Sequence, residues 1–177
     1  RKSEEARRKE AGEKLADNLS PASRADRDIV SCKPVDAEEM SAIYRQVFKS
    51  YPFPIQKQTY LKRMMKAGVL YFCIRIEGRI AAIAAAEIDL ENKNVEMTDF
   101  ATIPKLRGKG LANALLSHME KKTFNYGIKT AYTIARAASH GMNTVFKNNG
   151  YNYAGFLKNN SQISGSIQSM TVWYKHL

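Results

Sequence analysis

The sequence predicts a single α/β domain, of the α+β kind, in which helices flank a mixed, mostly antiparallel sheet. Its length of 177 residues is enough for one hydrophobic core and too short for two ordinary domains. Residues 70–103 contain three apolar runs separated by two short turns, which is typical of an antiparallel meander. A glycine-containing loop follows, and then an amphipathic segment at residues 111–127 predicts a long helix.

The N-terminal segment differs in composition from the rest of the chain. Residues 1–28 hold eight Lys or Arg and seven Asp or Glu with almost no large apolar residue, so they cannot bury a core face. We expect a charged linker or a solvated helix here, followed by one domain at residues 29–177. Because the chain begins with Arg1 rather than Met, we expect it to be a fragment whose first segment joined an upstream domain.

The first elements of the domain are a strand, two helices and the meander. Asp36 followed by Glu39 has the spacing of a capping box, which predicts a helix start. The prolines at 52 and 54 end this helix, and Gly68 ends the next one. The expected elements are a strand at 29–35, helices at 37–48 and 58–68, and strands at 70–77, 79–90 and 95–103.

The last third contains two more helices and three more strands. Apolar residues at 111, 115, 116, 119 and 124 form a helical stripe that ends at Gly127, and Gly150 is expected to end the second helix. The expected elements are helices at 111–127 and 139–150, a strand at 129–136, and a final strand pair at 151–157 and 169–177.

The cysteines and apolar runs indicate the compartment. Cys32 and Cys73 each lie in an apolar run without a CxxC or Cys/His spacing, so we expect two reduced, buried thiols and no metal site. No apolar run approaches the length of a membrane span. We therefore expect a soluble, cytoplasmic protein without a membrane partner.

The net charge of +11 is concentrated in the last third of the chain. Residues 104–177 hold ten Lys or Arg and a single acid, Glu120, and this excess begins at the glycine loop. A basic half-domain beside such a loop favours an anionic ligand. A basic face that contacts nucleic acid is the alternative, although aromatic residues do not interleave with the basic ones as a base-stacking surface requires.

The glycine loop reads KLRGKGLA at residues 105–112 and connects a predicted strand to a predicted helix. Gly108 and Gly110 leave backbone N–H groups accessible at the positive end of the helix dipole, a geometry that binds phosphate. No Walker A sequence is present. A Rossmann fingerprint would need Gly or Ala where Asn113 stands and an acid about 20 residues later, so both nucleotide-binding classes are disfavoured.

Arg107 to Ala112 matches Arg/Gln-x-x-Gly-x-Gly/Ala, and with this order of elements residues 29–177 resemble the GNAT superfamily of N-acetyltransferases. The strings SYPFPI, VEMTDFATIPKLRGKGLA, KTAYTIARAASHGMN, KNNGYNYAG and ISGSIQSMTVWYK are similar to those of the beta-lysine N-acetyltransferases within it. The resemblance implies the GNAT fold and acetyl-CoA as co-substrate. It further implies acetyl transfer to β-lysine, giving the osmolyte Nε-acetyl-β-lysine, by direct attack in a ternary complex.

The same resemblance implies a set of acetyl-CoA contacts. In the family the loop amides hold the pyrophosphate, and the strand before the loop lines the pantetheine arm. Ser139 stands where the family commonly has an Asn that bonds the pantetheine amide. The expected cofactor-binding residues are Phe100, Ala101, Thr102, Arg107, Gly108, Lys109, Gly110, Leu111, Ala112 and Ser139.

The chemistry requires a base, because a lysine-type ammonium has a pKa near ~10.4 and only the neutral amine attacks. Five acids lie on the meander just before the loop, between positions 87 and 99. The resemblance places the base at Glu96, with Asp99 as the second candidate. On a regular strand these two would face opposite sides unless a bulge re-aims one of them. Phe146 stands where the family commonly has a Tyr general acid.

The acceptor side has its own candidates. Tyr51 and Phe53 are expected to form a wall, Arg136 to bind a carboxylate and His140 to bind substrate or move protons, with Arg75 as a further carboxylate candidate. The expected partner is a small-molecule amine, and a homodimer is a candidate assembly. The alternatives are a GNAT enzyme for a polyamine or a protein lysine, and a non-catalytic acyl-CoA-binding module, which the Phe at position 146 keeps open.

Overall fold

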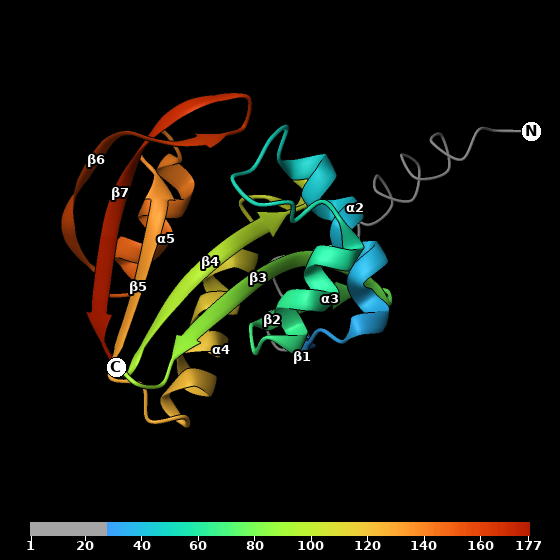
Figure 1. The fold of residues 1–177 in the computed structure, drawn as a ribbon, viewed down its shortest axis with the longest axis horizontal. Coiled ribbons are helices and arrows are strands. Elements are labelled where there is room, and N and C mark those ends of the chain that lie inside the picture. The colour runs from blue at the N-terminus through green and yellow to red at the C-terminus, as the bar shows by residue number, and fades with distance from the viewer. Residues whose placement is uncertain (1–27) are drawn as a thin grey trace, which may run out of the picture.

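A computed structural model of the protein describes residues 28–177 (Figure 1). The expectation for residues 1–28 therefore lies outside the described residues, apart from Asp28. The strands of the described chain are β1 Ile29–Ser31, β2 Leu70–Ile76, β3 Arg79–Asp89, β4 Asn94–Thr102, β5 Thr130–Arg136, β6 Asn152–Ile163 and β7 Ser166–His176. The helices are α2 Ala37–Val47, α3 Gln58–Lys66, α4 Leu111–Phe124 and α5 His140–Asn148, with short 3-10 helices η1 Pro34–Asp36 and η2 Pro104–Leu106.

The seven strands form one sheet in the order β1-β2-β3-β4-β5-β7-β6. Every neighbouring pair is antiparallel except β4 and β5, which run parallel. The predicted mixed, mostly antiparallel sheet is therefore confirmed. Helices cover both of its faces, with α2 and α3 in front of the sheet in Figure 1 and α4 behind it.

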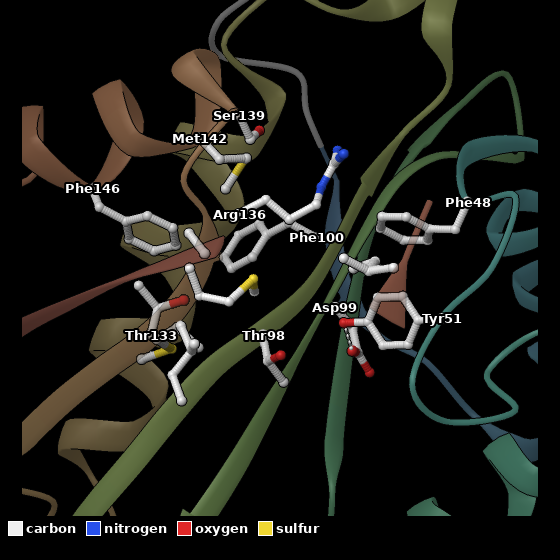
Figure 2. A pocket seen from close by; sticks show the side chains of 15 residues that line it. Phe48, Tyr51, Thr98, Asp99, Phe100, Thr133, Arg136, Ser139, Met142 and Phe146 are labelled. Carbon is white, nitrogen blue, oxygen red and sulfur yellow. Dashed lines mark hydrogen bonds between the residues drawn. The ribbon is translucent and has the colours of Figure 1, made fainter. Parts of the chain in front are cut away.

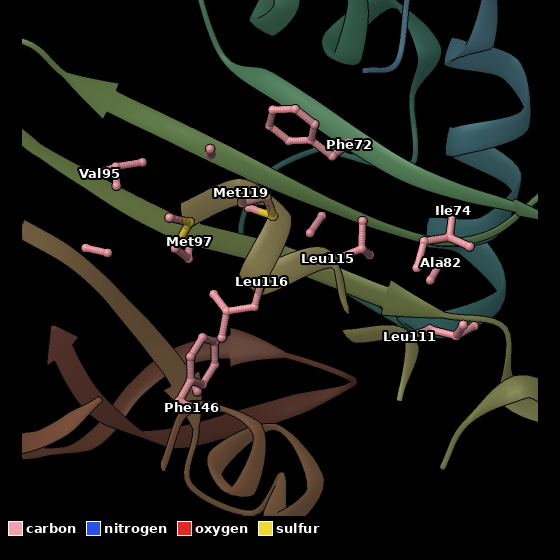
Figure 3. Close-up of a cluster of buried hydrophobic side chains, with 14 of the residues drawn as sticks. Phe72, Ile74, Ala82, Val95, Met97, Leu111, Leu115, Leu116, Met119 and Phe146 are labelled. Atoms are coloured by element: carbon pink, nitrogen blue, oxygen red, sulfur yellow. The ribbon is translucent and has the colours of Figure 1, made fainter. Parts of the chain in front are cut away.

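The sheet separates two hydrophobic clusters. Leu115, Leu116 and Met119 of α4 are fully buried against one face, together with Val95 and Met97 of β4 (Figure 3). Residues of α2 and α3 pack with Ile55, Tyr71, Cys73, Ile80, Ile83, Ala85, Ala101 and Ile163 in the second cluster. Because side chains alternate along a strand, β4 presents Glu96 and Thr98 to the α2 and α3 side, opposite to its apolar residues.

β4 contains a bulge, the condition under which Glu96 and Asp99 can share one side of the sheet. Ala85 pairs with Thr98 and Ile83 pairs with Ala101, so Asp99 and Phe100 together oppose the single residue between them on β3. Asp99 has a positive φ of 54°, a backbone conformation that non-glycine residues seldom adopt. The bulge shifts the alternation by one residue. Asp99 therefore lies on the α2 side with Glu96, as its bond to Tyr51 shows.

The parallel strands β4 and β5 pair only at their beginnings. Their pairing covers Asn94 with Thr130, Val95 with Ala131 and Glu96 with Tyr132. Beyond these three pairs β4 and β5 separate and form a wedge. The second half of each strand borders the space between them. The bulge, at Asp99 and Phe100, begins three residues after Glu96, the last residue of β4 that pairs with β5.

The final hairpin is longer than predicted. The sequence indicated strands at 151–157 and 169–177, whereas β6 and β7 continue through residues 158–168 to a two-residue turn at Ser164 and Gly165. Both turn residues have positive φ, of 56° and 89°, which matches the twist of a hairpin. The turn docks on the loop after α2 through bonds from the Ser164 and Gly165 N–H groups to Ser50, each under 3 Å.

α2 begins directly after Asp36, as predicted, but two predicted side-chain roles at the start of the domain are wrong. Asp36 makes no side-chain cap on α2, because its carboxylate accepts from the Lys33 N–H and pairs with Arg75 at 2.6 Å. Glu39 instead accepts from the Ile80 N–H at 2.8 Å and also pairs with Arg75. Arg75 is thus held by two carboxylates, which removes it as a carboxylate-binding candidate.

Candidate active site

The wedge between β4 and β5 holds a cavity. Its volume is about 90 Å³, and residues of the segment after α2, of β4, of β5 and of α5 line it together with the β6–β7 hairpin (Figure 2). The lining residues are Phe48, Tyr51, Met97, Thr98, Asp99, Phe100, Thr133, Ile134, Ala135, Arg136, Ser139, Met142, Phe146, Ile163 and Met170. Asp99 is the only carboxylate among these lining residues.

Asp99 is a buried carboxyl group held by a tyrosine. Its exposed fraction is 8%, and the Tyr51 hydroxyl donates to its Oδ1 at 2.6 Å (Figure 2). Burial raises the pKa of Asp99 to about 6, while the bond from Tyr51 acts in the opposite direction. No Lys or Arg of the described chain pairs with it. A carboxyl group with this pKa can accept a proton at neutral pH.

Glu96 lies outside the cavity lining, three residues before Asp99 on the same side of the sheet. Burial, followed by the charges of Glu87 and Asp99, raises the pKa of Glu96 to about 7. The Tyr132 hydroxyl on β5 donates to its Oε2 at 3.4 Å. Glu87 of β3 is the direct cross-strand partner of Glu96, and burial raises its pKa as well.

Aromatic rings form the opposite wall of the cavity. Phe146 is 1% exposed and meets Phe100 and Tyr151 edge to face, with ring centres 5.7 and 5.3 Å apart. Figure 2 shows Phe146 and Met142 on one side of the cavity, and Tyr51 with Asp99 on the other. Phe146 brings no hydroxyl to this wall, so it cannot supply a proton there.

The glycine loop has the backbone that its sequence predicts. Gly108 and Gly110 both have left-handed φ, of 75° and 74°, and Gly110 is the N-cap of α4. A Cβ at Gly108 would meet nothing within 4 Å, so the positive φ, and not a lack of space, favours glycine there. The first N–H groups of α4, starting at Leu111, have no partner within the helix. They can hold an anion at the positive helix end.

The loop after β5 is fixed by one amide side chain. Asn143 of α5 donates through Nδ2 to the Arg136 and Ser139 carbonyl oxygens, both at 2.9 Å. Its Oδ1 accepts from the Thr171 hydroxyl at 2.6 Å and from the Trp173 indole at 2.8 Å. Asn143 therefore holds Arg136 and Ser139 at the rim of the cavity, and sequence reasoning did not single it out.

The structure brings some predicted site residues into the cavity and leaves others out. Tyr51, Asp99, Phe100, Arg136 and Ser139 line it. Phe53 is 58% exposed and His140 is also exposed, and neither lies in the lining. The predicted cavity wall therefore uses Tyr51 without Phe53. Residues 107–110 lie between η2 and α4, and residues 111–112 begin α4. All of them lie outside the lining, as do the strand residues Ala101 and Thr102.

Several functional residues had no signal in the sequence. Thr98 and Thr133 line the cavity from the two separating strands, and Ile163 reaches it from the hairpin tip. A register between distant segments places each of them, so no local motif could have indicated them. For Glu87, the alternation along β3 sets its face, but only the pairing with β4 brings it beside Glu96.

Three further features concern the thiols, membrane spans and metal ligands. Both cysteines are free, with Cys73 buried as predicted and Cys32 partly exposed. Within residues 28–177, no helix is both long and apolar enough to cross a membrane. In the same part of the chain, no three His, Cys, Asp or Glu side chains gather as metal ligands would.

Comparison with known proteins identifies the family of this chain. Residues 37–151 match the profile of the acetyltransferase (GNAT) family. The chain is 46% identical over 140 residues to a beta-lysine N(6)-acetyltransferase of Methanococcus maripaludis, covering 79% of this chain and 51% of that protein. Its identity to the beta-lysine N(6)-acetyltransferase of Methanosarcina mazei is 37% over 142 residues, covering 80% and 52%. The chain thus spans about half the length of the curated relatives it matches.

Solved structures share the fold at low sequence identity. YncA of Salmonella typhimurium, solved with its cofactor acetyl-CoA, matches with a TM-score of 0.74 and 14% identity over 86% of this chain and 95% of that one. The predicted GNAT fold is confirmed by this likeness and by the family profile. The chain therefore belongs to the GNAT family of acetyltransferases.

Proposed function

We propose that this protein transfers the acetyl group of acetyl-CoA to the terminal (N6) amine of β-lysine, giving Nε-acetyl-β-lysine, an osmolyte. The observation that carries the proposal is the Asp99 carboxyl group, buried in the wedge without a cationic partner among the described residues. Such a group suits an acceptor that arrives as an ammonium ion and must lose a proton. The names of the two archaeal relatives supply the specific amine.

Acetyl-CoA would bind along the glycine loop and in the wedge between β4 and β5. The N–H groups at the start of α4 and the residues of the loop, Arg107 to Ala112, would hold the pyrophosphate. The separated edges of β4 and β5 offer backbone groups to the pantetheine amides, in the manner of a strand added between them. Ser139 at the rim would bond the same arm, and the cofactor supplies the activated acetyl group.

The acceptor amine would be deprotonated by Asp99. This assignment prefers Asp99 over Glu96, because only Asp99 lies in the cavity lining. The neutral nitrogen then attacks the thioester carbon directly in a ternary complex, and proximity supplies much of the acceleration. A carboxyl pKa of about 6 leaves Asp99 mostly ionised at neutral pH and still basic enough to accept the proton.

The tetrahedral intermediate would be stabilised by the bulge in β4. A bulge leaves a backbone N–H without a ladder partner, so the Asp99 to Thr102 segment can offer a donor to the oxyanion. The C–S bond then breaks and CoA leaves. Phe146 has no proton to give, but a thiol with a pKa of roughly 8.5 leaves well as a thiolate.

The test is release of free CoA thiol from acetyl-CoA with β-lysine, α-lysine, spermidine and a lysine peptide as acceptors. Turnover with β-lysine well above the other amines supports the proposal. Preference for spermidine or the peptide would assign the chain to another amine. Tight acetyl-CoA binding without turnover on any of them would make it an acyl-CoA-binding module.

A further inference from the structure

The cavity lining carries one positive and one negative side chain. Among the described residues that line it, Arg136 is the only cation and Asp99 is the only carboxylate. The two form no ion pair with each other. The partly buried guanidinium of Arg136 also forms no ion pair or hydrogen bond with any other residue in the described part of the chain. An unpaired charge that is partly removed from water is unfavourable, so an anionic group bound in the cavity would offset this cost.

Arg136 and Asp99 lie on the same side of the sheet. Along β5, Ala135 packs in the hydrophobic cluster against α4, so the alternate residues Tyr132 and Arg136 point to the opposite side. The bond from the Tyr132 hydroxyl to Glu96 agrees with this orientation, because Glu96 lies on the α2 side. The bulge in β4 turns Asp99 to that side as well. Both charges can therefore contact one acceptor molecule.

The two charged residues stand on opposite edges of the wedge. β4 and β5 run parallel, and their last pair is Glu96 with Tyr132. Asp99 and Arg136 come three and four residues later, which is about 10 and 13 Å further along the strands at a rise of roughly 3.3 Å per residue. They therefore lie at similar heights where the strands have separated. Figure 2 shows the guanidinium and the carboxylate apart from each other, at two ends of the lining.

An amino acid with a terminal amine has the complementary charges. In β-lysine the carboxylate and the terminal ammonium group lie at the two ends of the carbon chain, and the second amine lies close to the carboxylate. A guanidinium group binds a carboxylate through two parallel N–H···O bonds. With the carboxylate at Arg136, the terminal amine can extend to Asp99, whereas the second amine stays near Arg136.

The backbone at Arg136 is already held in place for this role. The Asn143 side chain donates to the Arg136 carbonyl oxygen at 2.9 Å, and it is itself fixed by bonds from Thr171 and Trp173. Binding therefore has to order only the side chain of Arg136, which limits the entropy lost. Arg75, the other predicted carboxylate ligand, is occupied by two carboxylates of the chain.

We propose that Arg136 binds the carboxylate of the acceptor and makes the chain selective for amino acids over amines without a carboxylate. This inference rests on the proposed function and names the residue that determines its specificity. Spermidine has no carboxylate, and the residue carboxyl of a lysine inside a peptide is part of an amide bond. Neither acceptor can therefore pair with Arg136.

The experiment compares β-lysine with 1,4-diaminopentane, which is β-lysine without its carboxyl group. The 177-residue chain is assayed for kcat/KM with both acceptors, as wild type, Arg136→Gln and Arg136→Lys. The ratio of the β-lysine value to the diamine value is expected to fall about 10- to 100-fold in Arg136→Gln. Arg136→Lys keeps the charge but not the paired bonds, so an intermediate ratio is expected. The control is Arg79→Gln, which removes an exposed arginine at the start of β3 and is expected to leave the ratio unchanged.

Three results would overturn the inference. The first is a wild-type chain that acetylates 1,4-diaminopentane as well as β-lysine. The second is an Arg136→Gln variant with the wild-type ratio, including one in which only the acetyl-CoA KM rises, because Arg136 would then serve the cofactor. The third is an equal fall of the ratio in Arg79→Gln. If Arg136→Gln is inactive with both acceptors, the ratio in Arg136→Lys decides by the same criterion.

Failure of the proposed function is distinguished by binding. If the wild type acetylates no amine, the proposed function fails, and calorimetric titration of β-lysine and of 1,4-diaminopentane in the presence of CoA tests Arg136 by itself. Tighter binding of β-lysine that weakens about tenfold or more in Arg136→Gln supports the inference. Binding of β-lysine that is no tighter than that of the diamine, or that the variant leaves unchanged, overturns it.

Discussion

Replacing Asp99 by Asn distinguishes the role of the carboxyl group in the reaction from its effect on the stability of the fold. The carboxyl group has an ordinary pKa of 3.8, which burial raises to about 6 in the folded chain. At 1.36 kcal/mol per pH unit, this difference corresponds to roughly 3 kcal/mol. Because the folded pKa is the higher one, the folded state binds the proton more tightly. Asp99 therefore favours the fold below pH 3.8, and this contribution is lost as the pH rises through about 6.

The assay is urea unfolding of wild type and Asp99→Asn between pH 4 and pH 8, together with acetyl transfer at pH 8. The asparagine keeps an oxygen for the Tyr51 hydroxyl but carries no charge, so the variant is expected to lose about 2.4 kcal/mol less stability over this range, which is the part of the linkage that falls above pH 4. Its turnover is expected to fall by a factor of about 10²–10⁴ because the base is gone. Glu91→Gln serves as the control for loss of one acid.

The reasoning would be refuted by an Asp99→Asn variant that turns over like the wild type at pH 8. It would be refuted equally by stability curves for the two proteins that run parallel from pH 4 to pH 8. In the first case Glu96 would be the base, since burial and neighbouring charges raise its pKa to about 7. In the second case the carboxyl group would be better solvated than its 8% exposure indicates.

Three further predictions concern Tyr51, Gly108 and Glu120. Tyr51→Phe removes the bond that lowers the pKa of Asp99, so the acid limb of the pH–rate profile is expected to move to higher pH; an unmoved limb would show that Asp99 does not control it. Gly108→Ala is expected to cost about 1 kcal/mol in urea unfolding, because φ is 75° there, and to raise the acetyl-CoA KM several-fold while the amine KM stays constant. Glu120→Gln breaks its 2.8 Å pair with the partly exposed Lys175, and we expect a loss of about 1–2 kcal/mol; an unchanged urea midpoint would contradict this.

The order of elements was readable from the sequence because it depends on neighbours along the chain. β3 follows from a continuous apolar run, and the alternation in β4 and the apolar stripe of α4 follow from periods of 2 and 3.6 residues. The glycine loop was readable for the same reason, since Gly108 and Gly110 adopt the left-handed conformations that glycine permits. The predictions of side-chain contacts failed where a side chain could bond to more than one partner. Asp36 bonds Arg75, more than thirty residues away, instead of capping the helix beside it.

What the sequence determined by itself is therefore the meander, the glycine loop and the supply of acids and bases, all of which are local. The tertiary structure decided which of these groups meet. The bulge in β4 turned Asp99 to the side of the sheet on which Glu96 lies. The register with β3 brought Glu87 beside Glu96. The separation of β4 from β5 opened the cavity. These outcomes depend on pairing between distant segments, and a one-residue change of register would have sent each side chain to the other face of the sheet.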